Sequence, residues 1–235
     1  MSTVPMNLRR PPLLPSADRR RCLGVAAALV LAVAVAVAPS PARAQQAYED
    51  FVFAVANDRA AQVKGLLARG IDPNTVDRNG DPALVIAARE GYAATVDVLL
   101  AGKANVNART PNGDSAIMVA ALGGHFEVVK KLRASGAAVN SAGWTPLIYA
   151  ATGGRDAIVV YLLGEGADVN AASPNGTTAL MMAVRENHPA TAELLLARGA
   201  DPNIRNQNGA SALDWAKRND DKALVERLRR AGALE

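Results

Sequence analysis

The chain has 235 residues, half of them hydrophobic, with 26 lysines and arginines against 22 aspartates and glutamates. The first 44 residues hold six of the arginines and one of the acidic residues, which leaves 20 basic and 21 acidic residues in the rest of the chain. A nearly neutral remainder lacks the basic field that attracts nucleic acid or anionic lipid. The only cysteine, Cys22, also lies in this first segment, which excludes disulfides and thiol chemistry from the remainder.

The first 44 residues are ordered like a secretory signal peptide. Three arginines at 19–21 precede an apolar run over residues 23–38, and Ala42 and Ala44 then follow at the small-x-small spacing of a cleavage site. The run of 16 residues is shorter than the roughly 20 that span a bilayer as a helix. We therefore expect cleavage between Ala44 and Gln45, and a periplasmic or secreted protein.

Three questions about this leader stay open: whether it is cleaved, by which route it is exported, and where translation starts. An uncleaved leader would make the protein a membrane-tethered scaffold. The paired arginines fit either the general secretory route or the twin-arginine route. Translation could start at Met1 or at Met6.

From residue 47 onward the sequence repeats. The segment Glu165-Gly-Ala-Asp-Val-Asn170 has near-copies that end in asparagines 33, 33, 30 and 33 residues apart, at Asn74, Asn107, Asn140, Asn170 and Asn203. Such a period is typical of stacked supersecondary units. A glycine, a short apolar helix pattern, a break and an apolar pair follow each copy, so each unit is predicted to be turn, helix, helix.

Two stretches, Gly143-Trp-Thr-Pro-Leu-Ile-Tyr-Ala-Ala151 and Gly176-Thr-Thr-Ala-Leu-Met-Met-Ala183, are the clearest copies. Together with the Gly-Ala-Asp-Val-Asn segments, they make the chain resemble the ankyrin repeat family. The resemblance implies an all-α domain over residues 45–235, an α-solenoid of about six helix-turn-helix repeats joined by β-hairpin-like fingers. Its units are expected at residues 47–76, 77–109, 110–142, 143–172, 173–205 and 206–235.

Some positions depart from the regular unit. Lys103 stands where other units end their second helix with glycine, and a left-handed residue there would carry a Cβ penalty. The first unit lacks a preceding hairpin, which suits the end cap of a stack. We expect six of its apolar side chains to point inward: Phe51, Phe53, Val55, Val63, Leu66 and Leu67.

One finger is shorter than the others. Only two residues separate Asn140 from Gly143, three fewer than in the corresponding turns, so we expect a notch in the row of fingers. Trp144 follows directly, and exposed aromatic residues are enriched among interface hot spots. Whether Trp144 contacts a partner or packs over the gap stays open at this stage.

We find no pattern for catalysis. His125 and His188 occupy the same position of units that are not adjacent, so they would lie too far apart to ligate one metal. The paired carboxylates Asp220-Asp221 and Glu49-Asp50 are sequence neighbours, which face different sides of a helix. We therefore expect no enzyme activity, no cofactor and no metal site.

The resemblance implies a partner on the concave surface that the fingers and first helices form. The residues expected there are Trp144, Asp81, Arg89, Glu90, Asp114, Leu122, Tyr149, Thr152, Thr177, Arg185, Glu186 and Arg218. The predicted function is that of a monomeric, non-catalytic protein–protein interaction module that binds a partner protein. A narrower version of this prediction is a module that inhibits or protects an exported enzyme. The alternatives are a small-ligand-binding or enzymatic protein that uses the groove, and the membrane-tethered scaffold.

Overall fold

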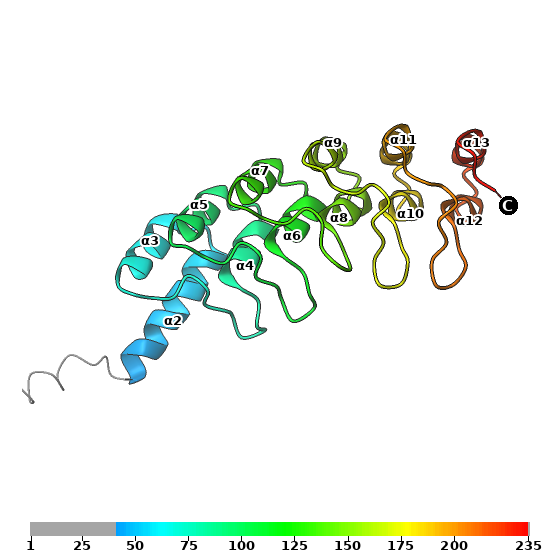
Figure 1. The fold of residues 1–235 in the computed structure, drawn as a ribbon. Helices are drawn as coiled ribbons and strands as arrows, with labels where there is room; N and C mark the ends of the chain where they lie inside the picture. Colours follow the sequence, from blue (N-terminus) through cyan, green and yellow to red (C-terminus); the bar gives the residue numbers. More distant parts are fainter. Residues whose placement is uncertain (1–40, 235) are drawn as a thin grey trace, which may run out of the picture. The chain divides into compact units, whose positions relative to one another are not determined.

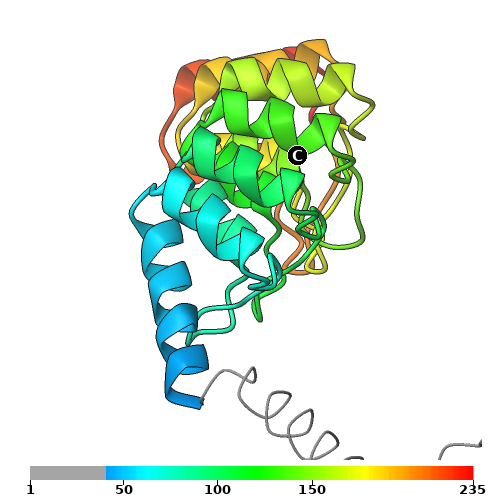
Figure 2. The same ribbon diagram turned by 90° about the vertical axis from the view of Figure 1, so that its left-hand side faces the viewer.

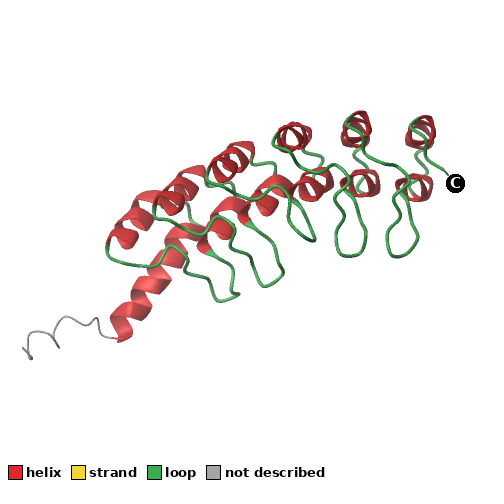
Figure 3. Cartoon of the chain, viewed as in Figure 1, coloured by secondary structure: helices red, strands yellow, loops and turns green. Residues whose placement is uncertain are grey.

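The computed structural model describes residues 41–234; the expected signal peptide lies almost wholly outside the described residues. Residues 46–235 make one compact unit. Within the described residues the chain forms helices joined by turns and loops, with no strand longer than an isolated bridge (Figure 3). The helices are α2 (Pro41–Ala56), α3 (Ala60–Ala68), α4 (Ala83–Arg89), α5 (Ala93–Ala101), α6 (Ala116–Gly123), α7 (Phe126–Ala134), α8 (Pro146–Thr152), α9 (Asp156–Gly164), α10 (Ala179–Arg185), α11 (Pro189–Ala197), α12 (Ala212–Arg218) and α13 (Lys222–Arg230).

The helices from α2 to α13 come in six consecutive pairs that stack side by side. The first helices from α4 to α12 form one row, the second helices from α5 to α13 form the adjacent row, and the fingers project beyond the first helices (Figure 1). Figure 2, which views the stack from one end, shows the units behind one another. The predicted all-α solenoid of six helix-turn-helix units is therefore confirmed.

Small residues allow the first helices to lie close together. Each has an alanine pair or a single alanine near its middle that is fully buried, such as Ala87 and Ala88 in α4 and Ala150 and Ala151 in α8. The second helices supply the larger apolar residues, including Leu99, Leu132 and Leu162, which are also fully buried. Each unit thus buries the apolar face of its neighbour, as a stacked repeat requires.

Short polar residues start several of the first helices. The Thr145 and Thr178 hydroxyls accept hydrogen bonds from the third residue of α8 and α10, and Pro146 occupies the first position of α8, where its missing N–H costs nothing. In the last unit the Asp214 carboxylate accepts hydrogen bonds from the backbone N–H and the hydroxyl of Ser211, 2.8 and 2.9 Å away. This capping box satisfies backbone donors that a helix start leaves free.

The asparagines that end the repeated segments join one unit to the next. The Asn140 Oδ1 accepts a hydrogen bond from the backbone N–H of Asp168 at 2.9 Å, and its Nδ2 donates to the Gly166 carbonyl at 2.8 Å. Asn107, Asn170 and Asn203 make the same two bonds to the units that follow them. The repeated asparagine is therefore a connection between units.

The fingers are tight turns closed by few backbone bonds. Isolated bridges join Val76 to Pro82, Arg109 to Ser115 and Ala172 to Thr178. In the shortened finger we observe a different closure, in which the Ser141 hydroxyl donates to the Trp144 carbonyl at 3.3 Å. The shorter turn thus changes how the chain enters α8.

The backbone of Lys103 agrees with the prediction made from the sequence. Lys103 has a φ of +67°, so it does adopt the left-handed conformation that glycine provides in the other units.

The prediction that Phe53 points inward is wrong. Its side chain is 51% exposed, and the Arg59 guanidinium carbon lies 4.7 Å from its ring centroid. Phe53 lies two residues after the buried Phe51, and that spacing places it on another side of α2.

The helix α2 includes the expected cleavage site. Ala44 and Gln45 are exposed and lie within α2, which begins at Pro41. No helix in residues 41–234 combines the length and the apolar composition needed to cross a membrane. Cleavage after Ala44 remains a prediction.

Candidate functional site

The fingers and the first helices α4, α6, α8, α10 and α12 together make what we call the finger face. Residues that follow the finger turns occupy equivalent positions along it. Asp81, Asp114 and Trp144 keep part of their surface accessible, and Trp144 is 36% exposed. Thr177, which was expected among them, is only 7% exposed. Its backbone N–H donates to the Ser173 hydroxyl at 3.0 Å, as the N–H groups of Asp81 and Asp114 donate to Asp77 and Thr110 at the equivalent positions. Thr177 therefore offers little surface to a partner.

Trp144, Tyr149 and Asp114 form a cluster near the middle of the finger face. The Trp144 and Tyr149 rings meet edge to face, with centroids 6.1 Å apart and planes at 87°. The Tyr149 hydroxyl donates a short hydrogen bond to the Asp114 carboxylate in the preceding unit. The cluster therefore presents an indole that is exposed on one side and supported on the other by a fixed phenol.

The environment of Tyr149 keeps its hydroxyl protonated. Burial, together with the hydrogen bond to Asp114 and the negative charge of that carboxylate, raises the pKa of Tyr149 well above the ordinary value of 10.0. The positive charge of Arg109 opposes this shift and is the smallest of its causes. Tyr149 is therefore a hydrogen-bond donor at neutral pH and not a base or nucleophile.

The shortened finger, for which the sequence predicts a notch, contributes to a surface depression. An open depression of about 410 Å³ lies beside it. Its lining consists of Asn140, Ser141, Ala142, Thr145, Asp168 and Ala171. Trp144 is absent from this lining, so the notch and the exposed indole are neighbouring features of the face and not one pocket.

The N-terminal part of the finger face carries a fixed ion pair and an exposed apolar residue. Arg89 donates to the Asp81 carboxylate at 2.8 Å, and Glu90 beside them is exposed. Leu122, at the position of Arg89 in the next unit, is 39% exposed. Thr152, at the same position of α8, is half-buried and donates its hydroxyl to the Ile148 carbonyl at 2.8 Å.

At the C-terminal part of the face, two arginines approach one indole. The guanidinium carbons of Arg185 and Arg218 lie 5.5 and 4.9 Å from the Trp215 ring centroid. Arg185 also pairs with Glu186 at 3.4 Å. Both arginines are among the contacts expected from the sequence, whereas Trp215 is not. The missed signal is that Trp215 occupies the position in α12 that Tyr149 occupies in α8.

The two histidines connect neighbouring units. His125 and His188 are N-cap residues of α7 and α11, and their Nε2 atoms lie 3.0 Å from the carbonyls of Arg89 and Thr152 in the preceding units. A Cβ on Gly91 would come within 2.4 Å of the His125 ring, so the glycine makes room for it. Both histidines therefore have structural partners.

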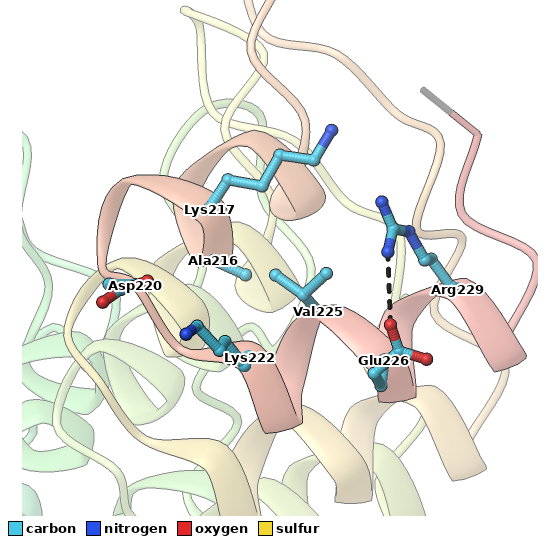
Figure 4. A pocket seen from close by; sticks show the side chains of 7 residues that line it. All are labelled: Ala216, Lys217, Asp220, Lys222, Val225, Glu226 and Arg229. Atoms are coloured by element: carbon cyan, nitrogen blue, oxygen red, sulfur yellow. Dashed lines mark hydrogen bonds and ion pairs between the residues drawn. The ribbon is translucent and has the colours of Figure 1, made fainter.

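Another hollow, of about 330 Å³, lies between α12 and α13 at the C-terminal end of the stack (Figure 4). Its lining mixes both signs of charge with two small apolar residues: Ala216, Lys217, Asp220, Lys222, Val225, Glu226 and Arg229. Arg229 pairs with Glu226 at 3.2 Å within it. Across residues 41–234 no group of histidine, cysteine, aspartate or glutamate side chains is arranged to hold a metal ion.

Comparison with protein families gives a direct match. The family model described as "Ankyrin repeats (3 copies)" matches residues 51–142, 86–173, 136–206 and 171–233. These matches cover more than half of the chain, and the chain therefore belongs to the ankyrin repeat family. Domains of this family generally mediate protein–protein interaction and are typically non-catalytic. A comparison with curated proteins gave no match.

Proposed function

We propose that this protein binds an exported partner protein through its finger face, with the cluster of Trp144, Tyr149 and Asp114 at the centre of the interface. The observation that carries the proposal is the exposed Trp144 indole held against Tyr149. Tryptophan and tyrosine are enriched among the few residues that supply most binding energy at interfaces, and such residues lie near interface centres.

The cluster is pre-organised. Trp144 has an aromatic neighbour at 87° and Tyr149 is fixed by Asp114, so these side chains lose little rotational freedom when a partner binds. Ordering a flexible side chain at an interface costs roughly 0.5–1.5 kcal/mol, and a side chain that is already held avoids part of that cost. The depression of about 410 Å³ at the shortened finger gives a partner loop a further place to contact the protein.

Polar groups surround this centre. Arg89, Glu90, Arg185 and Glu186 are exposed on the flanking units. An aromatic centre with a charged rim is the usual composition of a protein interface. The two titratable groups of this cluster, Tyr149 and Asp114, are hydrogen-bonded to each other, and Tyr149 is held protonated.

The proposed location is the periplasm or the cell exterior, on the strength of the leader: arginines, a 16-residue apolar run and Ala42-x-Ala44. An exported, monomeric binding domain suits the inhibition or protection of an exported enzyme. Retention of the leader would instead give a membrane-tethered form of the same binding domain.

Affinity capture with matched baits tests the proposal. Purified wild-type protein and Trp144→Ala are each exposed to a periplasmic extract. We expect one exported protein to be recovered repeatedly by the wild type and to be depleted with the variant. Equal recovery of every protein by both baits would contradict the claim that Trp144 lies at the centre of the interface. Recovery of nothing above background would contradict the claim that the protein binds an exported partner.

A further inference from the structure

Trp215, Arg185 and Arg218 form a cluster in the last two units that the central cluster does not explain. The Asn219 Nδ2 donates to the Val184 and Arg185 carbonyls at 2.9 and 3.3 Å, which ties the C-terminal end of α10 to that of α12. This connection holds Arg185 beside the Trp215 ring although the two residues are 30 positions apart. The arrangement is therefore fixed by the stacking of the units.

The two guanidinium groups retain free hydrogen-bonding capacity. Arg218 is exposed, and within residues 41–234 its guanidinium contacts the Trp215 ring without a hydrogen bond to a protein acceptor. Arg185 meets Glu186 only through Nε, at the long distance of 3.4 Å. A guanidinium stacked on an aromatic ring keeps the N–H groups of its edge available for two parallel hydrogen bonds to a carboxylate.

The surrounding charges favour an anion. Two arginines share one indole, and like charges held near one another raise the local positive potential. Two acidic groups in the same units, Glu186 and Asp214, are already engaged. Glu186 pairs with Arg185, and Asp214 accepts from Ser211 and pairs with Arg205 at 3.2 Å. The Ser211 hydrogen bonds are the largest cause that lowers the pKa of Asp214, so this carboxylate stays ionised and occupied by its own helix start.

We propose that Trp215, Arg185 and Arg218 form a docking site for an acidic segment, with neighbouring aspartate or glutamate carboxylates, of a protein partner. This inference rests on the proposed function of the finger face and names the chemistry of one part of the partner. Carboxylates of the segment accept hydrogen bonds from the two guanidinium edges while its backbone lies along the Trp215 side of α12. The near-neutral charge of residues 45–235 gives no field for a long polyanion, which favours a short acidic protein segment over nucleic acid.

A peptide titration tests this site without the natural partner. The probe is a fluorescein-labelled, glycine-flanked peptide with four consecutive glutamates, and its counterpart carries four glutamines. We measure fluorescence anisotropy with the purified full chain at low salt. We expect saturable binding of the glutamate peptide alone, and a loss of about tenfold in affinity for Arg218→Gln, on the scale of one charge-assisted pair.

Matched variants separate this site from general charge attraction. Arg198 is exposed at the end of α11. Arg198→Gln also removes one positive charge from the last two units, and it should leave the affinity for the peptide within about twofold of the wild type. Arg218→Lys keeps the charge but loses the planar edge, so it should weaken binding by at least about threefold. Circular dichroism confirms that each variant is folded.

Several results would overturn the inference: no binding of the glutamate peptide, equal binding of the glutamine peptide, an equal loss in Arg198→Gln, or full affinity in Arg218→Lys. Tighter binding of a 12-mer oligothymidylate with the same dependence on Arg218 would assign the site to nucleic acid instead. The proposed function has a separate readout, because partner capture that depends on Trp144 can succeed or fail whatever the peptide does.

Discussion

The Tyr149 phenol on α8 donates a hydrogen bond to the Asp114 carboxylate, which belongs to the preceding unit. This bond crosses the boundary between two units on the finger face, and the same phenol supports the Trp144 indole edge to face. One side chain therefore contributes both to the stacking of the units and to the proposed binding centre.

Replacement of Tyr149 by phenylalanine removes this hydrogen bond and leaves the half-buried Asp114 carboxylate with one partner fewer. We expect the free energy of unfolding at pH 7 to fall by about 1–2 kcal/mol, the cost of a lost hydrogen bond to a charged group. Urea unfolding followed by circular dichroism measures it. An unchanged midpoint would show that the bond adds nothing to stability.

The raised pKa of Tyr149 also predicts a pH dependence. Above the ordinary value of 10.0, a tyrosine in the unfolded chain loses its proton while Tyr149 in the folded protein keeps it. The unfolded state then binds fewer protons, so the stability of the wild type falls as pH rises above 10.0. Tyr149→Phe lacks this contribution, and we expect its stability to fall less steeply between pH 9 and pH 11. Parallel curves for the two proteins would contradict the perturbed pKa.

Asn140→Ala tests the connection between units. The substitution leaves the Asp168 N–H and the Gly166 carbonyl without their side-chain partner. We expect a loss of about 1–3 kcal/mol in the free energy of unfolding. Asn112→Ala is the matched control, because Asn112 is exposed in a finger turn and its loss should change stability by less than about 0.5 kcal/mol. Equal effects of the two variants would reject the asparagine connection.

Lys103→Gly should stabilise the protein. Lys103 has a φ of +67°, where a Cβ costs roughly 1–2 kcal/mol and glycine costs nothing sterically. After the entropy cost of glycine in the unfolded chain, we expect a net gain of about 0.5–1 kcal/mol in urea unfolding. Lys103→Ala retains the Cβ and should give no such gain, so a similar increase in both variants would refute the strain argument.

Much of the array could be predicted from the sequence, because local patterns determine it. The period of the terminal asparagines, the glycines of the turns and the apolar pairs of the second helices all repeat within each unit. The left-handed Lys103 also follows from local comparison, since it stands where other units have glycine.

The site could be predicted only in part, because side-chain directions depend on contacts between units. The short finger predicted a notch, and a depression lies beside that finger, but the sequence did not reveal that Trp144 packs on Tyr149 and stays out of the lining of the depression. Thr177 shares its repeat position with Asp81 and Trp144 yet is buried. Trp215 lies beside Arg185 because α12 stacks on α10, where Asn219 joins the two helices.

The central claim is that Trp144 contributes more to binding than to folding, and one pair of measurements on Trp144→Ala tests it most directly. Calorimetry against the captured partner gives the affinity, and urea unfolding gives the stability. We expect an affinity loss of at least about 2 kcal/mol with a smaller loss of stability, as for an interface aromatic residue. Val160→Ala, which alters an exposed apolar residue on the second helix α9, should change neither quantity. A large fall in the free energy of unfolding with unchanged partner affinity would contradict the claim and assign Trp144 to packing.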